Sequence, residues 1–283
     1  MWYYIDMSFK FFSKDEGHLA RTRKEQFGYI IRNNVSTLFI SNVIAFVFTI
    51  PLIIVFILFS INFHQLSITE GSTTNQFISV FMITGGLTFV STIVFNLGLI
   101  GQYTVIKELV LNSTSKLSSF FKGIKSNFKD TIFPNILYSI VFALLVINVG
   151  TYLYVQLSAP FKLVILIINI SLCFLLLLGK GYINFEMVVF KNKTLVYIRN
   201  GVYLFYKNLP LSLVELILIL IPFIAIGFVP INFVFIPVGL LATCYISLAS
   251  LANFIIAISC YEKLFSKEEI PAIYHKGLED INL

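Results

Sequence analysis

The stretch VSTLFISNVIAFVFTIPLIIVFILF, residues Val35–Phe59, carries no charged side chain and decides the fold of this chain. A helix needs about 20 predominantly apolar residues to cross the hydrocarbon core of a bilayer. Five further apolar stretches meet or approach that length, at Phe77–Ile100, Thr131–Val155, Leu163–Leu178, Leu211–Val229 and Phe233–Ser259. We therefore expect an all-α, polytopic membrane helical bundle with six transmembrane helices.

The composition of the whole chain supports this class. Its 283 residues are 58% hydrophobic and 12% charged, with a mean hydropathy of +0.89. Soluble domains are about 25% charged, so this chain lacks the polar side chains that would cover a water-soluble globule. The same numbers exclude a disordered chain, a coiled coil and a disulfide scaffold.

The distribution of lysine and arginine predicts the orientation in the membrane. If the N-terminus is cytoplasmic, 19 of the 20 basic residues fall in cytoplasmic segments and Lys162 alone lies outside. This asymmetry follows the positive-inside rule, so we expect both termini in the cytoplasm. It also accounts for the net charge of +6, and nucleic acid is not expected as a partner.

We expect the chain to divide into three parts. Residues 1–34 would form a cytoplasmic segment with an amphipathic helix, residues 35–259 the membrane domain, and residues 260–283 a charged cytoplasmic tail. Three tandem units, each an interfacial helix followed by a helical hairpin, would cover approximately residues 27–106, 116–178 and 195–259. Repeats of this kind occur in transporters, and simple duplication of a stable hairpin explains them equally well.

A basic amphipathic segment precedes each hairpin, and residues 116–129 show it most clearly. Apolar side chains occupy one side of a helix and lysines the other: Leu117, Phe120, Phe121, Ile124 and Phe128 against Lys122, Lys125 and Lys129. Such a helix should lie in the membrane interface with its apolar face in the acyl region. The pair Gly123-Ile124 recurs 78 residues later as Gly201-Val202. We expect six cations of these segments to contact anionic lipid headgroups: Arg32, Lys122, Lys125, Lys129, Arg199 and Lys207.

Four polar residues inside the predicted spans are candidates for an intramembrane polar site: Glu215, Asn96, Asn148 and Asn253. An ionisable group inside a membrane is costly and often functional. Glu215 either plays such a role or lies at headgroup depth and pairs with Lys207. The asparagines either line a polar path or form hydrogen bonds between helices. Glu186 is expected at the membrane interface.

The sequence contains no motif that indicates catalysis. It has no GxSxG, HExxH or Walker loop, and its three cysteines do not have a metal-ligand spacing. Because these motifs carry the chemistry of the corresponding enzyme classes, we expect a protein that is not an enzyme and has no catalytic residue, cofactor or metal site.

Four segments carry a resemblance to a known family: FVFTIP (Phe46–Pro51), NLGLIGQYTVIKELV (Asn96–Val110), SSFFKGIKSNFKDTI (Ser118–Ile132) and YIRNGVYLFYKNLP (Tyr197–Pro210). They resemble the YesL-like multi-pass membrane proteins of bacteria, over most of the chain from about Phe27 to Phe265. The resemblance implies a bacterial plasma membrane and no established reaction. It also implies an accessory role beside ATP-driven (ABC-type) importers of carbohydrate, whose subunits would be partners together with the lipid bilayer.

Two hypotheses for function follow. The first is a non-enzymatic accessory component linked to ATP-driven carbohydrate uptake. The second is a stand-alone small-solute transporter or channel with a polar path that includes Glu215.

Overall fold

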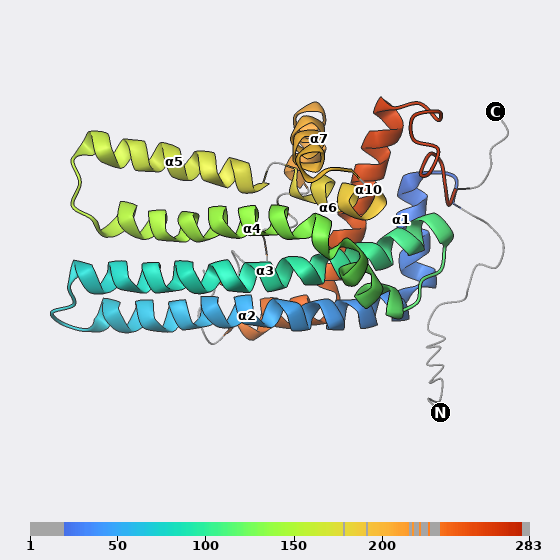
Figure 1. Ribbon diagram of the computed structural model, residues 1–283. Coiled ribbons are helices and arrows are strands. Elements are labelled where there is room, and N and C mark those ends of the chain that lie inside the picture. The colour runs from blue at the N-terminus through green and yellow to red at the C-terminus, as the bar shows by residue number, and fades with distance from the viewer. Residues whose placement is uncertain are drawn as a thin grey trace.

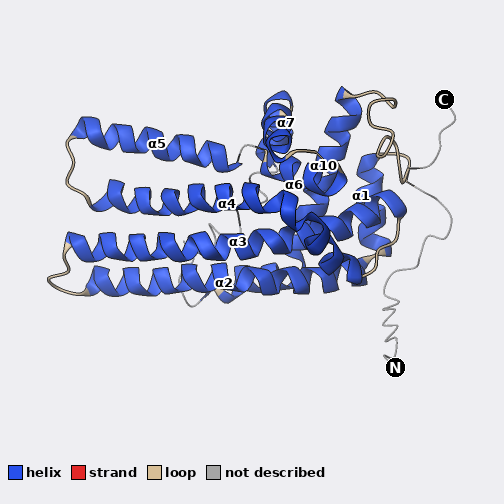
Figure 2. Ribbon diagram, in the orientation of Figure 1, coloured by secondary structure: helices blue, strands red, loops and turns tan. Residues whose placement is uncertain are grey.

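The computed structural model describes residues 20–177, 179–190, 192–214, 217, 221, 226 and 233–278. Within these ranges all regular secondary structure is helical, which confirms the expectation of an all-α chain (Figure 2). The elements are α1 (Arg23–Asn33), α2 (Val35–Ile68), α3 (Thr74–Asn112), α4 (Ser118–Tyr154), α5 (Ala159–Leu177), α6 (Lys180–Val189), α7 (Thr194–Lys207), α9 (Phe235–Leu240), a π-helical turn (Leu241–Tyr245) and α10 (Ile246–Leu264).

Four helical stretches are long and apolar enough to cross a bilayer: α2, α3, α4 and the run Phe235–Leu264. By length and composition they make the chain a membrane protein. In Figure 1, α2, α3, α4 and α5 lie side by side as an elongated bundle. The predicted span over residues 163–178 corresponds to α5, whereas the predicted span over residues 211–229 lies largely outside the described residues. The count of six spans therefore stays a prediction.

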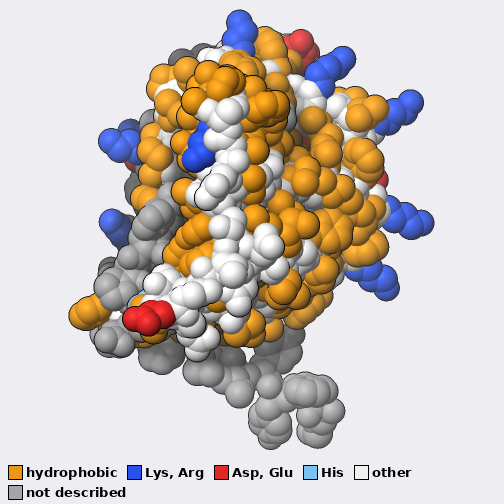
Figure 3. All heavy atoms as spheres, turned by 90° about the vertical axis from the view of Figure 1, so that its left-hand side faces the viewer, with side chains coloured by type: hydrophobic (Ala, Val, Ile, Leu, Met, Phe, Trp, Pro, Cys, Tyr) orange, Lys and Arg blue, Asp and Glu red, His pale blue; other side chains and the backbone are white. Residues whose placement is uncertain are grey.

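The outer surface of the bundle is apolar. Large hydrophobic side chains are exposed on all four helices: Val47, Ile54, Met82, Ile83, Val90, Phe133, Leu144, Phe161, Val164 and Ile167. Figure 3, which views the molecule along the bundle, shows hydrophobic side chains over its sides and Lys and Arg side chains around the periphery. A surface of this kind is stable against lipid tails and unstable in water, so these helix faces are the ones expected to contact lipid.

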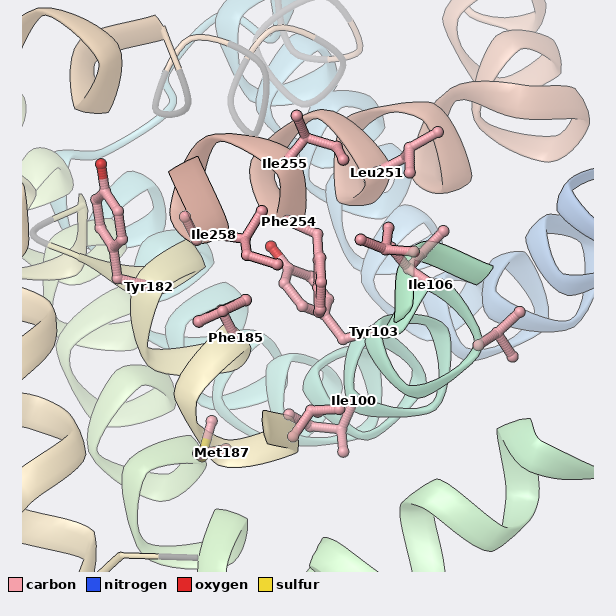
Figure 4. Close-up of a cluster of buried hydrophobic side chains, with 14 of the residues drawn as sticks. Ile100, Tyr103, Ile106, Tyr182, Phe185, Met187, Leu251, Phe254, Ile255 and Ile258 are labelled. Atoms are coloured by element: carbon pink, nitrogen blue, oxygen red, sulfur yellow. The ribbon is translucent and has the colours of Figure 1, made fainter. Parts of the chain in front are cut away.

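At the other end of the molecule the helices form a compact unit, which we call the head. The head comprises α1, residues 100–112 of α3, residues 118–130 of α4, α6, α7, α10 and residues 265–278. Its interior holds the largest fully buried side chains, including Tyr182, Phe185 and Phe254. Figure 4 shows Phe185 of α6, Phe254 of α10 and Tyr103 of α3 directed into one cluster. Tertiary contacts between helices distant in sequence therefore build the head.

The predicted amphipathic segment 116–129 and the span that follows it form one helix, α4, with Pro134 inside it. The first turns of α4 do not follow α3 along its remaining length. Instead Phe120 covers Gly101, where a Cβ atom would lie 2.6 Å from the Phe120 ring, and Gly123 lies against Thr104. Figure 1 shows these first turns crossing the bundle obliquely. Phe120, expected on the lipid side, is fully buried against α3, while Phe121 and Phe128 are exposed.

The predicted span over residues 233–259 changes direction at the π-helical turn. The π-helical turn lies beside α2, whereas α10 crosses the ends of α2 and α3 and belongs to the head (Figure 1). A π-helical turn is a common cause of a bend in a helix. An apolar run does not reveal whether lipid or protein surrounds it, so the sequence could not locate this change of direction.

Candidate functional site

The side chain of Lys180 lies where the bundle meets the head. Gly179 adopts a left-handed conformation, with φ of +73°, and Lys180 is the first residue of α6. The Lys180 ammonium donates a hydrogen bond of 2.7 Å to Oδ1 of Asn96 on α3. Its nitrogen also lies 5.4 Å from the ring centroid of Phe95 and 5.2 Å from that of Tyr138. Burial lowers the pKa of Lys180 to about 8. Among the described residues, no carboxylate lies within ion-pair distance of this ammonium.

The second polar cluster, around Glu186, corrects the expectation that this carboxyl lies at the membrane interface. Glu186 is fully buried because α6 packs between α7 and α10. The Tyr261 hydroxyl of α10 donates to one carboxyl oxygen, and the Asn200 amide of α7 donates to the other at 3.3 Å. Burial raises the pKa of Glu186 to about 7, although both hydrogen bonds oppose that shift. The three side chains join three helices of the head.

A third cluster joins α2, α3 and the π-helical turn. The Asn42 side chain donates to the carbonyl oxygens of Leu241 and Ala242, at 2.8 and 2.9 Å, and accepts from the backbone N–H of Ser247 at 2.9 Å. The Asn42 side chain therefore pairs with backbone groups at the π-helical turn, where the regular α-helical hydrogen bonds are interrupted. Gln102 of α3 donates to the hydroxyls of Ser41 and Ser247.

The fourth cluster ties the N-terminal helix of the head to its C-terminal segment. Arg23 of α1 donates to both carboxyl oxygens of Glu262 on α10, at 2.5 and 3.0 Å, and to the carbonyl oxygens of Lys276 and Ile273. Gln26 accepts from Arg23 and donates to the carbonyl oxygens of Val110 and Gly277. Both Arg23 and Glu262 are nearly excluded from solvent. A bidentate pair of this kind is specific in geometry and costly to break.

The structure does not bring the predicted intramembrane polar residues together. Asn96 forms the hydrogen bond to Lys180, and Asn253 is buried on α10 in the head. Asn148 is half-buried on α4, next to Ile147, which contacts the position of Gly85 on α3. Eleven residues of α3 separate Gly85 from Asn96, about 16 Å along a helix. Glu215 lies outside the described residues.

The six predicted headgroup cations are all exposed and all belong to the head: Arg32, Lys122, Lys125, Lys129, Arg199 and Lys207. Nζ of Lys207 lies 5.9 Å from the ring centroid of Tyr203, which is itself half exposed. On α7 the opposite side is buried against α6, through Gly201, Leu204 and Phe205.

The part of the chain that the structure describes holds no group of three or more His, Cys, Asp or Glu side chains able to bind a metal ion. Of the cysteines whose surroundings are described, Cys244 is exposed and Cys260 is buried near the Tyr182 hydroxyl. Neither cysteine forms a disulfide.

Sequence reasoning missed the roles of Lys180, Arg23 and Asn42. Lys180 and Arg23 looked like the other basic residues that set membrane orientation. One signal was present for Lys180: it directly follows an apolar stretch and a glycine, so it begins a new element close to the membrane boundary. No local pattern marks Arg23, because its partner Glu262 is 239 residues away in the sequence.

Comparisons of this chain with models of known protein families, with curated proteins and with solved structures give no match.

Proposed function

We propose that this chain is a six-span, multi-pass protein of the bacterial plasma membrane that acts as a non-enzymatic accessory component of an ATP-driven carbohydrate importer. The observation that supports an accessory role best is the head. Its buried polar groups, among them Arg23, Glu262 and Gln26, bond to one another and to backbone groups of α3 and of residues 265–278. These groups fix a defined shape on one side of the membrane bundle, as a docking partner requires.

The same side of the molecule carries the positive charge. The exposed cations of the interfacial helices all lie on the head, whereas the opposite end of the bundle has Lys162 in the first turn of α5 and Glu70 between α2 and α3. The positive-inside rule then supports a head in the cytoplasm, together with both termini. In that orientation the head faces the compartment in which importer ATPases work.

The α7 helix supports contact of the head with lipid headgroups. Its exposed side combines Arg199, Tyr203, Tyr206 and Lys207. Tyrosines beside cations are typical of the interface between hydrocarbon and water. We propose that this side, together with Lys122, Lys125 and Lys129 of α4, lies against anionic headgroups.

Purification in a mild detergent from the native membrane tests the proposal. We expect the permease and ATPase subunits of an importer to co-purify with the tagged chain, and to be absent when an unrelated tagged membrane protein is used. A chain that purifies alone under every detergent condition would contradict an accessory role. Solute flux into proteoliposomes that contain this chain alone, lost in Glu215→Gln, would favour a stand-alone transporter instead.

A further inference from the structure

Hydrogen-bond donors outnumber acceptors around Lys180. The ammonium has three N–H donors, and among the described residues the acceptor that it reaches is Oδ1 of Asn96. The amide nitrogen of the same Asn96 side chain is buried and has no acceptor among the described residues. Asn96 itself is only 2% exposed. A buried donor without a partner is rare in folded proteins and calls for a ligand or an ordered water.

A second unpartnered donor comes from α4. The Asn135 amide nitrogen is buried with no acceptor in the part of the chain that the structure describes, and Asn135 is 2% exposed. The α3 and α4 helices run antiparallel here, with Gly85 facing Ile147. From that contact, eleven residues along α3 and twelve along α4 lead to Asn96 and Asn135. One turn after Asn135, Tyr138 places its ring beneath the Lys180 ammonium.

The start of α6 adds to the positive character of this position. Lys180 is the first residue of α6, so its side chain starts from the turn that carries the first backbone N–H groups of that helix. These groups have no acceptor within a helix, and they carry the positive end of the helix dipole. A cation and a helix N-terminus therefore coincide at Lys180, and two buried amide donors lie at the corresponding level of α3 and α4. Among the described residues no carboxylate within ion-pair distance balances the Lys180 ammonium.

The depth of this position in the bundle suggests which anions could reach it. Asn96 lies 22 residues after Thr74, the first residue of α3. That length of helix rises about 33 Å, close to the thickness of the hydrocarbon core of about 30 Å. If the start of α3 marks the far membrane boundary, Asn96 and Lys180 lie at the boundary beside the head. Phosphate groups of lipids and soluble anions from that side both occur at this level.

We propose that Lys180, Asn96 and Asn135 form a binding site for one phosphate or carboxylate group at the junction of bundle and head. The ammonium and the two amide nitrogens donate to the anion, while Asn96 holds the ammonium in place through its oxygen. The rings of Phe95 and Tyr138 stabilise the cation when the site is empty. This site differs from the exposed cations of α4 and α7, and it does not depend on the importer association proposed above.

Thermal unfolding of the purified protein in a neutral detergent tests the site. The probes are phosphatidylglycerol against phosphatidylcholine in mixed micelles, and sodium phosphate against sodium chloride at equal ionic strength. Phosphatidylglycerol should raise the Tm of the unsubstituted protein and phosphatidylcholine should not, because a ligand that binds only the folded state stabilises it. Lys180→Met removes the cation and Asn135→Leu removes a donor, and each should weaken the apparent affinity about tenfold or more.

Matched controls separate this site from general attraction to charge. Lys24→Met removes an exposed cation of α1, and Asn148→Leu removes a half-buried amide of α4, the helix that carries Asn135. Both controls should keep the full shift in Tm. Lys180→Arg should recover part of the affinity, because it restores a cation. If Lys180→Met does not fold, Asn135→Leu carries the same test.

The outcomes distinguish the source of the anion. A shift with phosphatidylglycerol alone, reduced in the site variants and kept in the controls, identifies a lipid headgroup site. A shift with inorganic phosphate as well identifies a site for soluble anions. The proposal is wrong if neither probe shifts the Tm, or if the site variants and the controls respond equally.

Discussion

The bundle and the head use the same kinds of apolar residue in opposite ways. Ile83 of α3 is 64% exposed in the bundle, whereas Ile106 of the same helix is fully buried in the head. In the bundle, lipid is expected to complete the packing around such side chains. In the head, α6, α7 and α10 complete it, and buried polar groups such as Arg23 and Glu262 pair with one another. One continuous helix therefore passes from a lipid environment into a protein interior.

The largest effect is expected at the ion pair of the head. Arg23→Ala leaves Glu262 as a nearly buried carboxylate without its cation, and breaking such a pair costs about 3–5 kcal/mol. Thermal unfolding in detergent should show a large fall in Tm. The matched control, Lys24→Ala, removes an exposed cation from the next position and should leave Tm unchanged. Equal Tm values for the two variants would show that the pair does not hold the head together.

The same Ile→Ala substitution at two positions of α3 compares the head with the bundle. Ile106→Ala opens a cavity in the head and should cost about 2–5 kcal/mol. Ile83→Ala should cost less than about 0.5 kcal/mol, because its side chain lies on the outer surface and lipid or detergent refills the space. The midpoints of thermal unfolding of the two variants measure the difference. Similar losses would mean that the surface of the bundle is covered by protein.

Asn42 tests whether the π-helical turn depends on α2. Asn42→Leu leaves the carbonyl oxygens of Leu241 and Ala242 and the N–H of Ser247 without this partner. Each buried polar group left unpaired costs about 1–3 kcal/mol. Because the turn can relax, we expect the free energy of unfolding to fall by an amount near that range in total. Asn62→Leu, at an exposed position of α2, is the control. A variant at Asn42 as stable as this control would mean that the turn forms independently of α2.

The stability of the head should also depend on pH. The pKa of Glu186 is about 7 in the folded chain, above the ordinary value of 4.5, because burial disfavours the carboxylate. Below about pH 4.5 the carboxyl is protonated in both the folded and the unfolded chain, so its ionisation does not affect stability. Between pH 4.5 and 7 the unfolded chain ionises first, so the free energy of unfolding falls as the pH rises, and it levels off above pH 7. Tyr261 of α10 and Asn200 of α7 face this carboxyl.

Glu186→Gln should flatten the fall in Tm between pH 5 and pH 8. Glu25→Gln, at an exposed position of α1, should keep the slope of the unsubstituted protein. An unchanged slope in Glu186→Gln would assign the pH dependence to other groups.

Local patterns in the sequence predicted the helices of the bundle and the exposure of the cations. An uninterrupted apolar stretch is enough to identify α2, and lysines at helical spacing identify the exposed side of α4. The matched glycines of the repeat also have matching roles. A Cβ atom at Gly123 would lie 2.2 Å from the Thr104 hydroxyl of α3, and one at Gly201 would lie 2.4 Å from the Ile183 side chain of α6. Each glycine lets its amphipathic helix approach the preceding helix closely.

The head could not be predicted, because long-range contacts decide it. The amphipathic pattern of residues 116–129 shows which side chains avoid water, but not whether lipid or protein covers them, so Phe120 was placed on the wrong surface. Glu186 is buried because α7 and α10 fold over α6, which no local pattern encodes. The pairing of Lys180 with Asn96 joins residues 84 apart in the sequence.

The most direct test of a membrane bundle with its head on the cytoplasmic side is the accessibility of single cysteines. In a chain whose own cysteines at positions 173, 244 and 260 are replaced, Ser72→Cys lies between α2 and α3, and Ser118→Cys lies in the head. A membrane-impermeant maleimide applied to intact cells should label position 72 at once and position 118 only after the membrane is permeabilised. Labelling of both positions in intact cells, or of position 118 alone, would contradict the account.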